Sequence, residues 1–486
     1  MRHEKTILRA VRITGLAIVA AGWLGAQGTA SWIAQHQSEL TQRFAQLLAI
    51  PNQARDAPGI ERNAAAIEKL YQAEGVSTER LTVPGAPPVI YGRLDVPGAM
   101  RTITFYAHYD GQPVHPQDWQ QPPYQPLVRD GRIWARSAGD DKAAVFGFAA
   151  ALEALRAQRL RPRVNLHFFL EGEEEAGSPH LAQVLAQYAD RIQTDAWVLC
   201  DGPVHPSGAM QVFFGARGVT EVELTVYGPG RALHDGHYGN WAPNPIAMLA
   251  RLLASMRADD ARILIPGFYA DVRPLTAADR AAIAAMPKYD ATLAAALELG
   301  RTEGAPGSLA GQIAEPALNI RGIAGGFVGA GAANVISTEA SASLDFRLVP
   351  DQTPDRVRAE VEAFVRQQGY TIVRQPPDAA TRRAHPKLIL MKWSPGYPAA
   401  RVPTDAPFSR QVADLVERAA GAPMVLLPIM GGSIPMYLFQ GPSHTPVVGV
   451  PIANFDDNQH AANENLRLDS LWKGIAIYAG LFAGLR

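Results

Sequence analysis

The amino-acid sequence predicts an α/β fold, in which a mixed sheet carries helices on both faces and a smaller α+β domain is inserted into the chain. Two observations support this prediction. Short apolar runs at residues 102–107, 163–170 and 195–200 alternate with helical patterns, which is typical of a sheet covered by helices. From residue 217 the strands instead alternate polar and apolar side chains, and after residue 405 the first pattern returns.

These changes of pattern divide the chain into predicted domains. We expect a larger domain built from two segments, residues 31–214 and 399–486, and an inserted smaller domain at residues 215–398. The length of 486 residues agrees with two or three domains, because a domain has roughly 100–200 residues.

The predicted elements follow from the spacing of apolar residues. In residues 31–50, Phe44, Leu47 and Leu48 recur at helical spacing and predict a helix. In residues 218–227 (GVTEVELTVY), the alternation predicts a half-exposed strand, which we place at the edge of the inserted domain's sheet. By the same criteria we expect helices at 61–74, 141–158, 244–257, 354–368, 406–419 and 464–485, and strands at 340–348 and 446–452.

The first 30 residues have the pattern of a secretory signal peptide. Residues 1–12 are basic, residues 13–26 carry no charge, and the small residues of the segment Gly28-Thr29-Ala30 follow. The apolar run is shorter than the about 20 residues that a membrane span needs. We therefore expect a signal peptide at residues 1–30 and export to the periplasm or the exterior, with an uncleaved anchor or a buried helix as the alternatives.

Composition and charge exclude several kinds of site and partner. The 45 Lys and Arg residues are balanced by 46 Asp and Glu residues, for a formal net charge of −1. Because a protein that holds nucleic acid by charge needs a basic excess, we expect no nucleic-acid partner. Cys200 is the only cysteine, which excludes a disulfide framework and a cysteine-rich zinc finger. Any metal must therefore bind to His, Asp and Glu side chains.

Charged side chains gather at the predicted carboxyl ends of the strands, where ligands of open α/β sheets bind. His108 and Asp110 follow the strand at 102–107, and this spacing lets the imidazole bind a metal while the carboxylate takes its other N–H. Asp140 precedes a predicted helix, where it could bridge two cations or simply cap that helix. Asp201 and His460 follow two further strands.

Four glutamates lie in the segment EGEEEAGS (171–178), directly after an apolar strand. Their carboxylates repel one another at the mouth of a buried sheet unless cations are present. A surface helix can also carry four glutamates, and a His-x-Asp pair also occurs on ordinary surface loops. The combination of all these residues at one sheet edge is a more specific signal for metal binding than any single motif. It predicts a metal centre.

In this combination the chain resembles the dinuclear zinc metallopeptidase family of carnosinase, glutamate carboxypeptidase and succinyl-diaminopimelate desuccinylase. The motifs that carry the resemblance, in order over most of residues 40–480, are HYD (108–110), DDK (140–142), EEAGS (174–178), the strand-end Asp201 and His460. The segment RILIPGFY (262–269) favours the carnosinase-like branch. Ala143 replaces the family's glycine after DDK, and Glu173 adds a carboxylate that leaves the register of the glutamate pair open.

The resemblance implies two divalent metal ions, zinc by default, with manganese or cobalt as alternatives. The implied ligands, with Asp140 shared, are His108, Asp140 and Asp201 for one ion, and Asp140, Glu175 and His460 for the other. Asp110 would orient His108, and Glu174 would be the general base that takes a proton from a water activated by the two ions. The resemblance also implies a cis peptide bond between Asp140 and Asp141.

The resemblance further assigns catalysis to the larger domain and assigns the roles of lid and dimerisation to the inserted one. The implied substrate contacts are His234, Asn334, Arg347, Gly432 and Ser433. His234 would donate to the oxyanion of the reaction, and Arg347 would hold the substrate's carboxylate. In a homodimer paired through the strand at 218–227 and the helix at 244–257, His234 would act in the partner's active site.

The implied function is an exported, metal-dependent dipeptidase or carboxypeptidase that hydrolyses the amide bond of dipeptides or short peptides with a free carboxylate. One alternative is an amidase that acts on N-acyl amino acids, and another is a periplasmic binding or assembly protein that kept the fold without catalysis. A small peptide is the expected substrate, and we expect no membrane association after signal cleavage.

Overall fold

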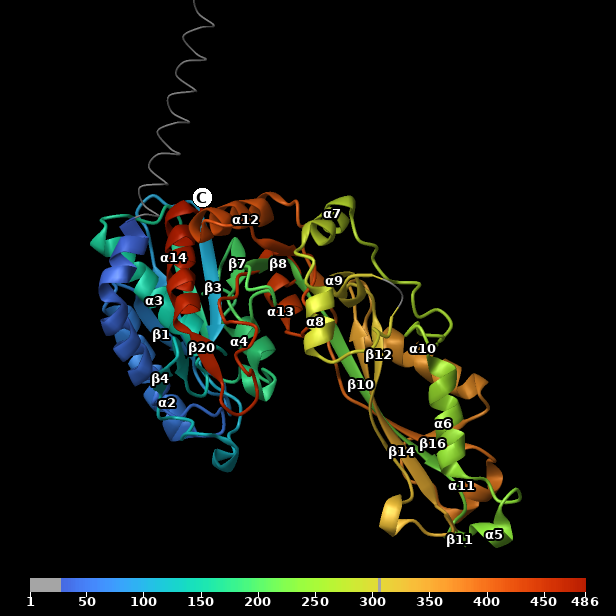
Figure 1. The fold of residues 1–486 in the computed structure, drawn as a ribbon. Coiled ribbons are helices and arrows are strands. Elements are labelled where there is room, and N and C mark those ends of the chain that lie inside the picture. The colour runs from blue at the N-terminus through green and yellow to red at the C-terminus, as the bar shows by residue number, and fades with distance from the viewer. Residues whose placement is uncertain (1–27, 305–306) are drawn as a thin grey trace, which may run out of the picture.

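The computed structural model describes residues 28–304 and 307–486 (Figure 1). Its principal sheets have eight and five strands, and helices lie against both, so the predicted α/β fold class with an inserted α+β part is confirmed. The predicted signal peptide lies outside the described residues except for residues 28–30, which belong to a helix described up to residue 48. Within the described part of the chain, no helix has both the length and the apolar character needed to cross a membrane.

The eight-stranded sheet is mixed and is assembled from residues 77–213 and 425–449. In sheet order its strands are β1 (Ser77–Leu81), β2 (Val89–Leu94), β6 (Asn165–Glu171), β3 (Thr102–His108), β7 (Ala196–Leu199), β19 (Val447–Gly449), β8 (Gln211–Phe213) and β18 (Val425–Leu427). The central strands β6, β3, β7 and β19 run parallel to one another, whereas β2 and β8 on either side of them are antiparallel to β6 and β19. Their carboxyl ends therefore meet at one edge, where charged residues from distant parts of the sequence come together.

Alternate residues along the central strands face two different cores. Phe105 and Phe168 pack into one core, and the next residues along their strands, Tyr106 and Phe169, pack into the other. The helices of the first core are the one ending at residue 48, α2 (Ala57–Gln72), α3 (Lys142–Ala157), α12 (Pro407–Ala420) and α14 (Leu468–Gly484). Those of the second core are α4 (Leu181–Gln187) and α13 (Met436–Gln440). Burial on both faces explains why these strands are continuous apolar runs in the sequence.

The five-stranded sheet is built from residues 218–393 and extends away from the first sheet (Figure 1). In sheet order its strands are β12 (Ala317–Ala324), β14 (Glu339–Leu348), β10 (Gly218–Tyr227), β16 (Leu388–Trp393) and β15 (Thr371–Val373). The helices α6 (Pro245–Met256) and α10 (Pro354–Gln367) share a core with one face of the sheet. The other face carries the polar residues of the alternating pattern.

The prediction that residues 218–227 form an edge strand is wrong. β10 lies in the middle of its sheet, paired with β14 on one side and with β16 on the other. Alternation along a strand reports which of its two faces is buried, and it carries no information about neighbours in the plane of the sheet. The strands at the edges are β12 and β15.

Between α6 and β12 the chain forms three short helices that the sequence analysis did not predict, and they lie between the two sheets (Figure 1). These are α7 (Ala277–Ala285), α8 (Asp290–Ala296) and α9 (Leu309–Ile313). The smaller elements are β4 (Leu127–Arg129), β5 (Arg132–Trp134), β9 (Gly215–Ala216), β11 (Leu233–His234), β13 (Val335–Ile336), β17 (Ala400–Arg401), β20 (Asn465–Arg467), α5 (Asp235–Tyr238), α11 (Ala379–Ala384) and the 3-10 turns η1 (Pro116–Asp118), η2 (Glu174–Ala176) and η3 (Gly329–Gly331).

Several predicted boundaries moved for local reasons. The helix expected at 61–74 begins at Ala57, because the Asp56 side chain accepts the Gly59 N–H and caps it. The helix expected at 464–485 begins at Leu468, because the residues before it form β20 and pair with β5. The strand expected at 446–452 is shorter, and its regular pairing covers only Val447–Gly449.

Candidate metal centre

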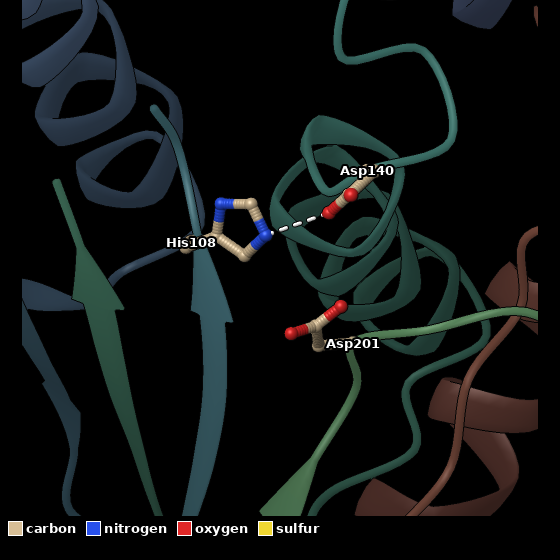
Figure 2. A group of neighbouring side chains, drawn as sticks. All are labelled: His108, Asp140 and Asp201. Carbon is tan, nitrogen blue, oxygen red and sulfur yellow. Dashed lines mark hydrogen bonds and ion pairs between the residues drawn. The ribbon is translucent and has the colours of Figure 1, made fainter. Parts of the chain in front are cut away.

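The candidate site lies at the carboxyl ends of the parallel strands. His108 is the last residue of β3, and Asp201 stands two residues after β7. Asp140 lies on the loop before α3, and Glu174 and Glu175 lie on the 3-10 turn after β6. Figure 2 shows His108, Asp140 and Asp201 pointing toward one another from these separate elements.

The structure brings the five residues predicted as ligands into two groups. His108, Asp140 and Asp201 form one, and Asp140, Glu175 and His460 form the other; within each group the ligand atoms lie within 4.8 Å of one another. Asp140 joins the groups, because its Oδ1 lies 2.8 Å from His108 Nε2 and its Oδ2 lies 3.1 Å from His460 Nε2. The alternative that Asp140 caps α3 does not hold, since Asp141 is the residue at the N-cap.

Carboxylates crowd the site and oppose one another's ionisation. Burial, followed by the charges of Asp201, Asp140 and Glu175, raises the pKa of Glu174 well above its usual range, although His108 acts in the opposite direction. Burial and then Asp140 raise the pKa of Asp201 to about 7. Carboxylates with these pKa values hold protons near neutral pH in the absence of another positive charge.

The two histidines supply part of the missing positive charge. Hydrogen bonds to Asp140 and Glu175 raise the pKa of His460 to about 10. Burial lowers the pKa of His108, but the neighbouring carboxylates of Asp110 and Asp140 more than offset it and leave the pKa well above the ordinary value. Without metal ions, these carboxylates therefore favour the protonated form of both rings. Imidazole nitrogens and carboxylate oxygens are also the ligand atoms that Zn²⁺ takes in proteins without cysteine, so the residues fit such an ion.

Asp110 fixes the glutamate pair as well as the histidine. Its Oδ1 accepts the N–H of Glu174 and its Oδ2 accepts the N–H of Glu175, each at 3.0 Å, and Oδ1 also lies 3.3 Å from His108 Nδ1. Glu173 faces elsewhere, since its carboxylate accepts the backbone N–H of His180 at 3.0 Å. The sequence left open which two of the three adjacent glutamates form the pair. In the structure, Glu174 and Glu175 lie beside the candidate ligands and Glu173 does not.

A buried carboxylate that the sequence analysis did not single out, Glu464, holds the Asp140 loop. It accepts hydrogen bonds from Arg136 Nη1 at 2.7 Å and from the backbone N–H groups of Ser137, Gly139 and Asp140 at 2.9, 3.0 and 3.1 Å. A glutamate four residues after His460 was the available signal, but nothing in the sequence showed that it faces this loop. The Asp140–Asp141 peptide bond on the loop is cis, as predicted.

Two glutamines were also missed, and both donate to candidate ligands. Gln459 Nε2 donates to Asp140 Oδ2 at 2.7 Å, and Gln112 Nε2 donates to Glu175 Oε2 at 2.8 Å. Such bonds orient carboxylates that bind metal. Gln459 was visible beside His460 in the sequence, whereas Gln112 carried no signal of its own.

A cavity of about 1020 Å³ opens beside the candidate ligands. Asp140, Glu174, Asp201 and His460 line one part of it, and the predicted substrate contacts Gly432 and Ser433 lie on its wall. The cavity is large enough for a small organic molecule, whose sites have volumes of roughly 300–1,000 Å³. The clusters are therefore open to a substrate.

The structure does not bring every predicted substrate contact into this cavity. Arg347 donates to Asp345 Oδ2 at 2.9 Å and to Ser433 Oγ at 2.8 Å, and so reaches the cavity only through Ser433. His234 is on β11 and Asn334 precedes β13, which pairs with β11. These strands lie at the end of the inserted part that is farthest from the eight-stranded sheet (Figure 1), where the His234 side chain is 53% exposed.

Comparisons with known proteins place this geometry in context. The sequence profile of peptidase family M20/M25/M40 matches residues 104–483. The Cys-Gly metallodipeptidase of Schizosaccharomyces pombe is 28% identical over 411 residues, which cover 81% of this chain and 81% of that protein. The human Beta-Ala-His dipeptidase is 28% identical over 411 residues, which cover 82% of this chain and 77% of that protein.

A solved structure has the same overall fold. The M20 family metallo-carboxypeptidase from Sulfolobus solfataricus superposes with a TM-score of 0.78 at 25% identity, and the match covers 92% of this chain and 99% of that one. The likeness therefore extends over both sheets and is not confined to the site.

Because Asp201 and His460 hold protons in the metal-free site, we expect metal binding to strengthen as the pH rises. Asp201 has a pKa of about 7 here and about 3.9 in an unfolded chain, so its protonated form stabilises the metal-free fold at low pH and this contribution is lost as the pH rises through about 7. A metal needs the carboxylate ionised and His460 neutral, so binding must expel both protons. We expect the increase in Tm caused by Zn²⁺ over EDTA-treated protein to be larger at about pH 8 than at about pH 5.5.

Scanning calorimetry at the two pH values measures this difference, and the EDTA-treated protein at each pH serves as its own reference. An equal increase in Tm at both values would show that binding displaces no proton.

Proposed function

The chain belongs to peptidase family M20/M25/M40 and is a metallopeptidase, and on this premise we propose that it hydrolyses the amide bond of dipeptides or short peptides that end in a free carboxylate. The observation that carries the proposal is the pair of ligand groups that share Asp140 at the wall of one cavity. The dipeptidase names of two relatives that match about four-fifths of the chain support the choice of substrate.

Two divalent ions, zinc in the first instance, would complete the site. His108, Asp140 and Asp201 would hold one, and Asp140, Glu175 and His460 the other. When bound, such ions lower the pKa of water and polarise the carbonyl of the scissile amide. Asp110, Gln112 and Gln459 would keep the ligand carboxylates and His108 in position.

Glu174 is proposed as the general base. Its side chain lines the cavity and is 19% exposed, so it can reach a substrate, whereas the adjacent Glu175 is hydrogen-bonded to Gln112 and lies 3.0 Å from His460. Without metal ions, burial and then its carboxylate neighbours raise the pKa of Glu174, which favours the protonated form of this side chain. It would take a proton from water and pass it to the leaving amine.

The protein loaded with Zn²⁺ is expected to hydrolyse dipeptides faster than N-acetyl amino acids, and EDTA should abolish both reactions. The matched control is Glu174→Gln, which keeps the shape of the side chain but cannot accept the proton. It should bind the same amount of metal and keep its Tm, while kcat falls by roughly 10²–10⁴-fold.

Metal analysis and a dipeptide library assay on both proteins test this expectation. Faster hydrolysis of N-acetyl amino acids would favour the amidase alternative. If Glu174→Gln kept its activity on both kinds of substrate, the general base would be another residue. Metal binding without hydrolysis of any amide would support the non-enzymatic alternative.

We further propose that Arg347 holds the substrate carboxylate. We also propose a homodimer in which His234 acts in the partner's active site. The outer edge of β12 pairs with no strand among the described residues, and a symmetric pair of such edges would satisfy both chains. Apolar side chains are exposed along and beyond this strand, with Ile323 61%, Phe327 81% and Val328 91% exposed. Because His234 lies far from its own chain's ligand groups, a role in catalysis requires a second subunit or a large movement.

Mixing two inactive variants distinguishes these possibilities. His234→Ala lacks the proposed oxyanion donor and Glu174→Gln lacks the base, so neither homodimer should turn over. After subunit exchange, a mixed dimer has one site with an intact Glu174 and an intact His234 from opposite chains. About a quarter of the wild-type activity should therefore return at full random exchange.

Exchange must be verified separately, for example by mass spectrometry of differently tagged subunits. If mixed dimers form and the mixture stays inactive, His234 completes the site of its own chain.

Export is proposed from the first 30 residues alone. The basic start, the uncharged stretch at 13–26 and the small residues at 28–30 are those of a signal peptide. Expression in a Gram-negative host should give protein in the periplasmic fraction that lacks these residues, as N-terminal sequencing would show. A full-length product in the cytoplasm would contradict export.

A further inference from the structure

The cavity continues beyond the candidate ligands along a wall of apolar side chains. The wall belongs to the helical lobe, which we define as residues 275–304 and 307–313 and which contains α7, α8 and α9. The large aliphatic residues that it contributes to the lining are Leu275, Ile283, Met286, Leu293, Leu309 and Ile313. The candidate ligands Asp140, Asp201 and His460 line the same cavity.

Further apolar side chains line the same cavity. Leu427, Met430 and Ile434 come from β18 and the loop after it, and Phe455 comes from the loop before His460. Leu309 and Phe455 are 45% and 40% exposed although they face a recess of the protein. Single exposed apolar residues are common on protein surfaces, but a cavity lined by several of them has the character of a ligand site.

Hydrogen bonds connect the helical lobe to the rest of the chain and fix the position of the apolar wall. Asp279 of α7 is 1% exposed, and its Oδ1 accepts the hydroxyl of Thr404 at 3.1 Å. Arg401 Nη2 donates to Pro274 O at 3.0 Å, next to the start of the lobe, and Arg217 Nη1 donates to Ile313 O at 3.3 Å, at the end of α9. Hydrogen bonds thus hold both ends of the lobe.

The charged groups of the lining outside the ligand set are few. Arg280 donates to Leu275 O within the lobe, and Asp290 accepts the Leu309 N–H at 3.3 Å. His205 stacks edge-on to Tyr289, with 6.4 Å between ring centroids, and Lys288 also lies on the lining. These groups are of both signs and are outnumbered by the apolar side chains of the lining, so the region is mainly apolar.

We propose that the apolar region between the helical lobe and the loop at 427–434 receives a bulky apolar side chain of the substrate. The chain then prefers dipeptides that carry leucine, methionine or phenylalanine over dipeptides built only from glycine and alanine. This inference rests on the proposed peptidase function, because it assigns the part of the substrate that lies away from the metal centre.

Two peptide series test the preference and identify which residue of the dipeptide it concerns. With the Zn²⁺-loaded protein, kcat/KM is measured for Gly-Gly, Ala-Gly, Leu-Gly and Phe-Gly, and then for Gly-Ala, Gly-Leu and Gly-Phe. In one of the series, the large apolar residue should raise kcat/KM at least about tenfold over the small one, since a methylene group in an apolar pocket is worth about 10-fold or more.

Matched substitutions connect the preference to the helical lobe. Ala284 and Ala285 are adjacent exposed alanines of α7, but only Ala284 lines the cavity. Ala284→Phe should lower kcat/KM for the large substrates about tenfold or more and leave Gly-Gly nearly unchanged, whereas Ala285→Phe should change neither. Leu309→Ser and Leu297→Ser form a second pair, because both leucines are exposed and only Leu309 lines the cavity.

A binding measurement gives a readout that does not depend on turnover. In metal-loaded Glu174→Gln, titration calorimetry with Leu-Gly or Gly-Leu should show tighter binding and a more negative heat-capacity change than with Gly-Gly, because apolar surface is buried. The Ala284→Phe substitution should remove this difference.

The outcomes separate the two proposals. If dipeptides are hydrolysed but the large apolar ones are not preferred, the apolar site is wrong and the peptidase function stands. If no dipeptide is hydrolysed, the peptidase function is wrong and the inference fails with it. Equal effects of Ala284→Phe and Ala285→Phe would also overturn it, since the lobe's inner face would then have no special role.

Discussion

The structure is organised around the shared carboxylate of Asp140. Its two oxygens face the two histidines of the candidate site, and the carboxylates of Asp201, Glu174 and Glu175 are close enough to influence one another's ionisation. In a buried region of low dielectric, such like charges are tolerated only with protons or cations among them. The arrangement is therefore costly for the fold and has a use only if positive ions occupy it, which is the physical reason to regard it as a metal centre.

A second buried carboxylate, Glu464, holds the Asp140 loop in place, and three of its four hydrogen-bond donors are backbone N–H groups. Glu464 accepts three backbone N–H groups and one guanidinium of Arg136, so its charge is distributed over four hydrogen bonds. Lys142 continues the same support on the other side, because its buried Nζ donates to Leu47 O and Ile50 O at 3.0 and 2.9 Å. The loop that carries the shared ligand is thus tied to the N-terminal helix and to the C-terminal segment, and its position depends on both ends of the chain.

The sequence indicated which charged residues gather at the sheet edge, because most of them follow strands whose burial on both faces makes the strands easy to recognise. His108 and Asp201 stand at the ends of apolar runs, and parallel strands bring such ends together. The position of β10 could not be predicted, since the pairing of a strand depends on segments as distant as β14 and β16. Glu464 was missed because its partners are mostly backbone N–H groups, which have no sequence signature. The helical lobe was missed because its helices are short and lack a long apolar repeat.

The two main parts of the molecule contribute differently to the site. The eight-stranded sheet and its loops position every candidate metal ligand, and these residues are fixed by parallel pairing and by buried hydrogen bonds. The helical lobe, which belongs to the inserted part, lines the same cavity with side chains outside the two candidate ligand groups. A change of residue in the lobe can therefore alter the space offered to a substrate without disturbing the charges around Asp140. Because the ligand groups and the apolar wall are held by separate sets of contacts, the chemistry of the site and its selectivity can vary independently.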